Sequence, residues 1–324
     1  MNKKLLLTLL VMTTQISGCS TQKAGGNIDI ILDRPLNILC STYPVYEWTK
    51  SIVGDIGTIE LLMDNGVDPH NYQATADDLI QMQTSDLIIY IGGDSESWIT
   101  DVIDNNSDIQ YINLMASLDK YTKDEEIIEG MEHNHDEHDH SSCSHSHVQD
   151  EHIWLSVKLA KEACNVISDA ISTIDTTNVQ TYSINLASYI EELDKLDNKY
   201  EQVVDNSDMD IIIFGDRFPF RYLLDDYDIN YYAAFTGCST DTEASFETIV
   251  FLAEKLDEEM VSSISYVSDS NKKIAETIVS SSQDDNREFI QFNSMEIVDH
   301  TDSSISYISI MEDNLASLEM ALGR

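Results

Sequence analysis

Histidine is the residue whose placement most strongly suggests chemistry in this sequence. Of the nine histidines, six fall within one short stretch between positions 133 and 147. Imidazoles bind Zn²⁺, Cu²⁺ and Ni²⁺, whereas Ca²⁺ and Mg²⁺ prefer sites made of oxygen alone. The stretch has no apolar face, so we expect a loop that does not pack and that offers many weak sites for transition metals. Its histidines are His133, His135, His138, His140, His145 and His147.

Two further histidines stand where a folded metal site could form. His70 follows an Asp-Pro pair after a segment expected to be a strand, and His152 follows Asp150 and Glu151 before a predicted helix. A side chain at the carboxyl end of a strand projects into the crevice where open α/β sheets bind ligands. The acids that precede each histidine could orient its imidazole. A lone histidine is more often an ordinary polar residue, but the two placements together favour metal ligation.

Two acids in the second half of the chain could face the same crevice. Asp216 follows an apolar segment that is expected to be a strand, and Glu243 lies on the helix after the next strand. Both positions are compatible with metal ligation from the edge of a sheet. Asp216 could instead cap the helix that follows it, and both roles stay open.

The charge balance excludes some classes of function. The 324 residues include 59 acids and 18 basic residues, which gives a formal net charge of −41. A nucleic-acid-binding protein needs a basic face, and an anionic membrane surface would repel this chain. Since 42% of the residues are apolar and 24% are charged, the chain has ample material for a core. Its length favours two domains.

The amino terminus is typical of an exported lipoprotein. Residues 1–18 begin with two lysines and continue with an apolar run that is too short to span a membrane. The run ends in Ile16-Ser17-Gly18-Cys19, which is similar to a bacterial lipobox, although a plain secretory signal is the alternative. We expect cleavage before Cys19, lipidation of its thiol and a polar tether over residues 19–35. The protein would then be extracytoplasmic and anchored to the cell membrane by lipid.

The other four cysteines form no Cys-x-x-Cys pair, so their spacing does not assign a disulfide. Cys40 lies in an apolar, strand-like run and Cys164 in a helix-like run, and buried free thiols are the expectation for both. Cys143 falls within the histidine-rich stretch. Cys238 has no assigned role.

Apolar strands and amphipathic helices alternate in two series, which predicts βα units and parallel sheets. Between the series, apolar residues at three- and four-residue spacings predict one helix over 178–204, about 40 Å long at ~1.5 Å per residue. The predicted strands are 37–41, 59–63, 87–91, 211–214, 231–235 and 264–267, and the other predicted helices are 46–53, 76–83, 220–227 and 242–258.

We therefore predict an α/β protein of two lobes with parallel sheets, joined by a long rigid helix, with a metal cleft between the lobes. The amino-terminal lobe covers 36–177 and includes a histidine-rich loop at 132–150. The linking helix covers 178–204, and the carboxyl-terminal lobe covers 205–324. A single rigid linking helix predicts a preformed cleft that closes by a modest tilt.

Three segments resemble the solute-binding lipoproteins of bacterial zinc and manganese ABC transporters. Asp68-Pro69-His70-Asn71-Tyr72 and the helix after it match the family's first motif, 85–98 matches its second, and Asp150-Glu151-His152-Ile153-Trp154-Leu155 matches its third. The matches occur in the family's order, and the resemblance covers nearly the whole mature chain. It implies two α/β lobes joined by a long helix, with one divalent metal held by side chains from both lobes.

The resemblance also implies which residues bind the metal. His70 and His152 fall on the first two family ligands. The third falls on Gly215, which has no side chain, so that ligand is lost or is supplied by Asp216. The fourth, an acid before a serine near the last strand, falls on Asn293. The expected site is therefore His70, His152 and Asp216, completed by water or Asn293, with Glu243 as a nearby alternative.

The leading hypothesis is a monomeric capture protein that binds Zn²⁺ and passes it to an ABC permease and its ATPase. Two imidazoles favour Zn²⁺ over Mn²⁺, which ranks low in affinity for nitrogen ligands. One alternative is a metallohydrolase, but neither a His-Glu-x-x-His helix nor a Gly-x-Ser-x-Gly elbow occurs in the sequence, so we expect no enzyme. The other alternative is a metal-stabilised surface lipoprotein that acts in adhesion or partner binding.

Overall fold

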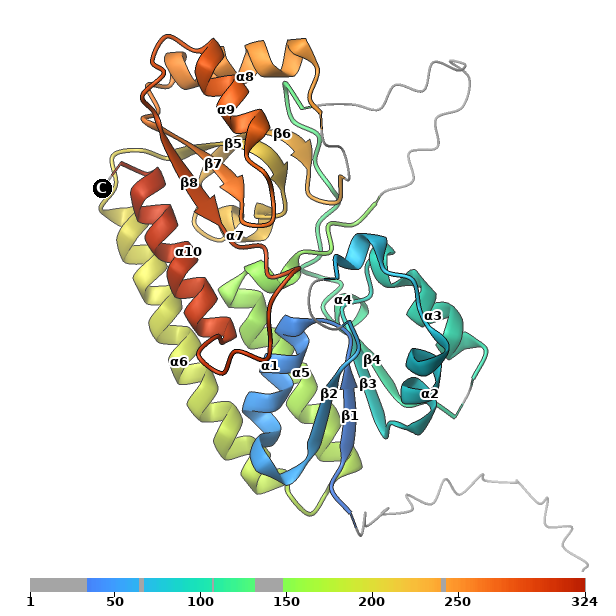
Figure 1. The fold of residues 1–324 in the computed structure, drawn as a ribbon. Helices are drawn as coiled ribbons and strands as arrows, with labels where there is room; N and C mark the ends of the chain where they lie inside the picture. Colours follow the sequence, from blue (N-terminus) through green and yellow to red (C-terminus); the bar gives the residue numbers. More distant parts are fainter. Residues whose placement is uncertain (1–33, 64–66, 107, 132–147, 240–242, 324) are drawn as a thin grey trace, which may run out of the picture. The chain divides into compact units, whose positions relative to one another are not determined.

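The computed structural model describes residues 34–63, 67–106, 108–131, 148–239 and 243–323. These residues belong to one compact unit, Ile31–Arg324, in which two parallel four-stranded sheets are each flanked by helices (Figure 1). The predicted two-lobed α/β fold is therefore confirmed. The predicted signal peptide, Cys19 and the six histidines of the histidine-rich stretch lie outside the described residues.

The first sheet has the strand order β2-β1-β3-β4, and all of its pairs are parallel. Every residue of β3 is buried, as expected for a parallel strand that is covered on both faces. The capping box formed by Thr75 and Asp78 begins α2. The elements are β1 (Asn37–Cys40), α1 (Tyr43–Val53), β2 (Thr58–Leu61), α2 (Ala76–Thr84), β3 (Leu87–Tyr90), α3 (Ser97–Asp104), β4 (Tyr111–Asn113), α4 (Leu114–Ser117) and α5 (Val157–Ile174).

The second sheet repeats this plan with the order β6-β5-β7-β8. The register between β5 and β6 shifts between Phe214 and Arg217, and β5 continues past this irregularity to Phe218. Gly215 lies at the shift, where an added Cβ would come within 2.6 Å of the Ala275 Cα on α9. The elements are β5 (Ile211–Phe218), α7 (Arg221–Asp225), β6 (Asn230–Thr236), α8 (Phe246–Glu258), β7 (Ser263–Val267), α9 (Lys273–Ser281), β8 (Glu288–Phe292) and α10 (Tyr307–Ala321).

One helix, α6 (Val179–Asp205), contacts helices of both lobes. It packs against α1 and α5 of the first lobe and against α10 of the second. The Tyr200 hydroxyl, buried on α6, donates to the Met311 carbonyl oxygen at 2.7 Å. A continuous apolar core includes residues of both lobes and of α6. The helix begins and ends one residue later than the predicted range 178–204.

The other predicted elements have the predicted type, and their ends differ by a few residues. The largest differences are at α8, which begins at Phe246 instead of residue 242, and at β5, which ends at Phe218 instead of residue 214. No range is predicted from the sequence for β4, β8, α3, α4, α5, α9 or α10. Cys40 and Cys164 are buried free thiols, as expected, and Cys238 is a partly exposed free thiol. Among the described helices, none combines the length and the apolar character needed to cross a membrane.

Candidate metal centre

His70 lies on a short 3₁₀ turn, Pro69–Asn71, beyond the carboxyl end of β2. The Asp68 carboxylate accepts a hydrogen bond from the His70 backbone N–H at 2.9 Å, which fixes the turn but not the ring. The ring is oriented from elsewhere: Nδ1 lies 2.8 Å from Ser95 Oγ and 3.3 Å from Glu151 Oε1. Ser95 also hydrogen-bonds to Glu151. The expectation that the acid before His70 orients its imidazole is therefore wrong.

His152 is fully buried, directly before the 3₁₀ turn Ile153–Leu155. One oxygen of Asp150 contacts both the His152 backbone N–H, at 2.9 Å, and the ring Nδ1, at 2.8 Å. Here the preceding acid does orient the imidazole, as predicted. Adjacent residues thus hold two different rings, since Asp150 holds His152 and Glu151 holds His70.

Both imidazoles present their remaining nitrogen to Glu296, which comes from the second lobe. His70 Nε2 lies 2.9 Å from Glu296 Oε1, and His152 Nε2 lies 3.3 Å from the same oxygen. The two ring centroids are 5.7 Å apart. The side chains of the two histidines are 7% and 0% exposed, and that of Glu296 is 0% exposed. Two nitrogens and one carboxylate oxygen therefore converge at one buried point.

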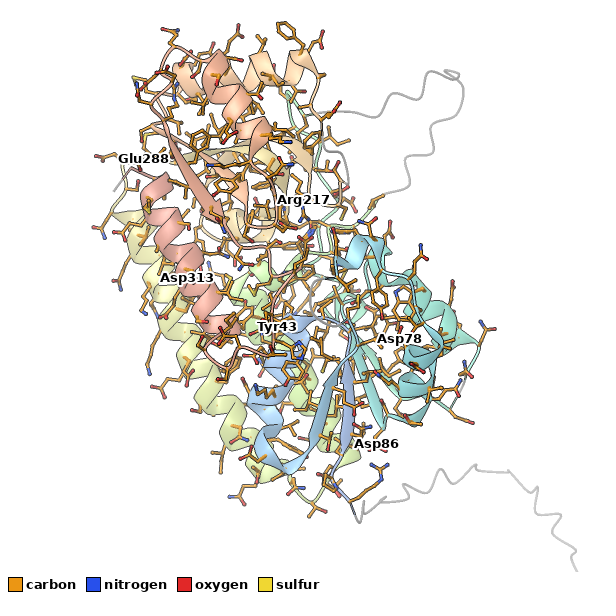
Figure 2. All side chains as sticks on the ribbon, in the orientation of Figure 1. Tyr43, Asp78, Asp86, Arg217, Glu288 and Asp313 are labelled. Carbon is orange, nitrogen blue, oxygen red and sulfur yellow. The ribbon has the colours of Figure 1, made fainter. Side chains whose placement is uncertain are left out.

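The other oxygen of Glu296 is anchored by its own lobe. Oε2 accepts hydrogen bonds from Ser294 Oγ at 2.5 Å and from Arg217 Nη1 at 2.6 Å, while Nη1 also lies 2.8 Å from Oε1. Arg217 (Figure 2) lies at the carboxyl end of β5. Its guanidinium also pairs with Asp269. Oε1 thus faces the imidazoles, while Oε2 is held by the second lobe.

The charges of this group are strongly coupled. Burial raises the pKa of Glu296, but hydrogen bonds from His152 and His70 and the charge of Arg217 outweigh burial and place this pKa well below its usual range. Burial lowers the pKa of His152, but Asp150 and Glu296 outweigh burial and raise this pKa to about 10. Metal binding at His152 would thus have to displace a proton from its imidazole.

Cys238, on the turn after β6, lies near the two imidazoles. One ligand atom each of His70, His152 and Cys238 lie within 4.8 Å of one another. The Cys238 backbone N–H donates to Glu125 Oε1 at 3.0 Å. Burial, with the charges of Glu151 and Glu125, raises the pKa of the Cys238 thiol.

A short two-stranded ladder supports this group of side chains. Glu125 N–H donates to the Val148 carbonyl oxygen at 2.7 Å, and Asp150 N–H donates to the Lys123 carbonyl oxygen at 2.8 Å. Between them, Asp124 and Gln149 form an antiparallel bridge. We call residues 123–125 and 148–150 the ladder. It directly precedes Glu151 and His152, and its Glu125 side chain reaches Cys238.

The structure does not bring Asp216, Glu243 or Asn293 to this group. Because β5 continues through its register shift, the Asp216 carboxylate lies within the sheet and accepts hydrogen bonds from the backbone N–H groups of Arg217, at 2.9 Å, and Val267, at 3.2 Å. The Asn293 side-chain oxygen accepts a bond from Met295 N–H at 2.8 Å, within a local turn. Glu243 is exposed.

Glu296, Cys238 and Arg217 are not among the site residues predicted from the sequence. All three lie at or beyond the carboxyl ends of parallel strands: Glu296 follows β8, Cys238 follows β6, and Arg217 is near the end of β5. The strand-end rule that selected His70 would have selected Cys238 and Glu296 too, had it been applied to β6 and β8.

Comparison with known proteins gives consistent matches over most of the chain. Residues 38–321 match the family described as "zinc-uptake complex component A periplasmic". The zinc-binding lipoprotein AdcA of Streptococcus pneumoniae strain R6 is 29% identical over 321 residues; the match covers 98% of this chain but 61% of that relative. The high-affinity zinc uptake system protein ZnuA of Bacillus subtilis is 29% identical over 309 residues, with 95% and 93% of the two chains covered.

Solved structures show the same fold. The Zn(II)-bound ZnuA-like domain of Streptococcus pneumoniae AdcA has a TM-score of 0.69 at 25% identity and covers 90% of this chain and 100% of that domain. The metal-dependent lipoprotein YcdH of Bacillus subtilis has a TM-score of 0.72 at 26% identity, with 88% and 98% covered. A laminin-binding adhesin of Streptococcus agalactiae has a TM-score of 0.72 over 89% of this chain and 99% of that one, but at 19% identity it shares the fold alone.

Proposed function

The chain belongs to the zinc-uptake complex component A family, and from this premise we propose that it captures Zn²⁺ outside the cytoplasmic membrane for an ABC importer. One observation carries the proposal: His70 and His152 of the first lobe and Glu296 of the second converge on one buried point, with both Nε2 atoms within 3.3 Å of the same carboxylate oxygen. Nitrogen and carboxylate donors at a closed site are typical of zinc.

The surroundings of the two imidazoles support metal binding. Zinc-bound histidines usually contact a carboxylate or another polar group through their second nitrogen, which sets the tautomer and the ring orientation. Asp150 serves His152 in this way, and Ser95 with Glu151 serves His70. Two imidazole donors favour Zn²⁺ over Mn²⁺.

The ligand set fits a carrier better than an enzyme. A metallohydrolase keeps one coordination position open and needs space for a substrate beside it. Here the three donors are 7% exposed or less, and Glu296 Oε1 closes the space between the two Nε2 atoms. We propose an ABC permease with its ATPase as the partner and a lipid anchor on Cys19. The histidine-rich stretch would be an auxiliary metal-binding segment.

Zinc titration against a competing chelator tests this function. In the mature chain we expect one tight step followed by weaker binding to the histidine-rich stretch. The double variant His70→Ala/His152→Ala should lose the tight step and most of the zinc-dependent rise in thermal midpoint, while keeping the weak binding. His300→Ala, which changes a histidine outside the group, should behave like the unmodified chain. A tight step that survives in the double variant would refute the proposed site.

A further inference from the structure

The turn after β6 brings a thiol to the two imidazoles. We propose that Cys238 is a fourth donor to the captured ion, so that His70, His152, Cys238 and Glu296 form a site for thiophilic cations such as Zn²⁺ and Cd²⁺. This inference rests on the proposed function, because it concerns the same ion. The three nitrogen and sulfur donors lie within 4.8 Å of one another, a spread that four-coordinate zinc can close by small side-chain adjustments.

Two contacts hold the thiol near His152. An added Cβ at Gly237 would come within 2.9 Å of His152 Cε1 and 3.0 Å of the Phe218 carbonyl oxygen, so the backbone of this turn lies directly against the ring. On the other side, Glu125 accepts the Cys238 backbone N–H at 3.0 Å. Because these contacts fix the turn, the Cys238 side chain is held near the His152 imidazole before any ion binds.

The charges around Glu296 explain why a thiolate is needed. Its carboxylate is shared with Arg217, whose guanidinium stays protonated in proteins and contacts both oxygens at 2.6 and 2.8 Å. Glu296 therefore offers a divalent ion less than a full negative charge. A thiolate from Cys238 supplies the second anion that two neutral imidazoles do not.

Metal binding at Cys238 exchanges the thiol proton for the metal ion. The Cys238 S–H bond breaks as the metal–sulfur bond forms, and the proton leaves to solvent, with no change in oxidation state. Soft thiolate donors favour Zn²⁺ and other soft ions over Mn²⁺, which prefers oxygen. This set of donors thus indicates that the proposed capture protein binds Zn²⁺ and other soft divalent ions.

Two spectroscopic measurements on the mature chain test this assignment with less than one equivalent of metal. X-ray absorption of the zinc form should show a zinc–sulfur distance of about 2.3 Å beside shorter distances of about 2.0–2.1 Å to nitrogen and oxygen. The cobalt form should show a thiolate-to-metal charge-transfer band. Cys238→Ser should abolish both signals and lower zinc affinity by about 100-fold, more than most losses of an orienting partner.

Cys143→Ser is the matched control, because Cys143 is the thiol within the histidine-rich stretch, and it should keep both signals. Signals that vanish in Cys143→Ser but persist in Cys238→Ser would overturn the assignment. So would a zinc form with no sulfur neighbour, a result that needs no variant. If that zinc is still bound tightly and His70→Ala weakens it, the capture function stands without the thiol. If the unmodified chain binds no ion tightly, the function itself fails.

Discussion

The two halves of the proposed metal centre are built differently. In the first lobe, His70 and His152 each have one ring nitrogen engaged by a polar partner, so the other nitrogen is aimed before any ion arrives. In the second lobe, Glu296 is paired with a fixed cation, Arg217, and Cys238 lies on a turn. The first half is thus a preoriented platform, and the second half is a charge-compensated cover. We expect the platform to set the preference for metals that bind nitrogen ligands, and the cover to control how firmly the ion is retained.

The largest expected effect is a loss of zinc affinity, and it should differ between a variant in the platform and a variant in the cover. His152→Ala should lower zinc affinity by about 100- to 1000-fold. Zinc binds four-ligand sites with a total free energy of about 10–16 kcal/mol, and each ligand contributes roughly a quarter of it. Glu296→Gln should cost less, since the carboxylate already shares its charge with Arg217. Chelator competition measures both variants. Equal losses of zinc affinity would show that the platform and the cover contribute equally to binding, contrary to the proposed difference.

Arg217→Met tests charge compensation in the cover. Without metal, this variant leaves Glu296 buried without its guanidinium, and the free energy of unfolding should fall by about 3 kcal/mol. With zinc the loss should be smaller, because the ion then compensates the carboxylate. Urea unfolding with and without zinc measures the difference. The control is Arg34→Met, which removes an exposed pair with Asp86 and should cost much less stability. Equal losses with and without zinc for Arg217→Met would contradict charge compensation by the ion.

Asp150→Asn tests the orientation of the platform. The amide weakens the contact that holds His152 Nδ1 at 2.8 Å, so zinc affinity should fall by about 10- to 100-fold. Asp169→Asn, at an exposed acid on α5, should leave affinity unchanged. Isothermal titration at low zinc occupancy distinguishes the two variants. An unaltered affinity in Asp150→Asn would mean that the ring is aimed by packing alone.

The smallest expected effects come from two glycines. Gly215→Ala would place a Cβ within 2.6 Å of the Ala275 backbone, and such overpacking should cost about 1–3 kcal/mol of stability without changing zinc affinity. Gly237→Ala would press on the His152 ring and should weaken zinc binding modestly. Thermal unfolding and zinc titration of both variants test whether the first change affects stability and the second affects zinc binding. A loss of zinc affinity in Gly215→Ala would show that residue 215 does influence the metal site.

The sequence predicted the platform better than the cover for a physical reason. His152 and its orienting acid are two residues apart, so a local motif contains both. The contact between His70 and Glu296 joins positions 226 residues apart, and only the packing of the lobes on α6 makes it visible. At Asp216, the alternation of strand and helix predicted a strand ending at residue 214. The register shift that carries β5 to Phe218, and so turns Asp216 into a structural residue, has no comparable local pattern.

The ladder of residues 123–125 and 148–150 has an evolutionary consequence. It places Glu125 and Val148, which flank residues 126–147 in the sequence, beside each other and close to the residues that contact His70, His152 and Cys238. Lengthening a flexible closed segment costs little, since each doubling of its length adds only about 0.6 kcal/mol of closure entropy. We therefore expect that the number of residues between 125 and 148, histidines included, can change in evolution while the contacts of Glu125, Asp150 and His152 are kept. One inserted residue between 148 and 152 would instead disturb both imidazoles at once.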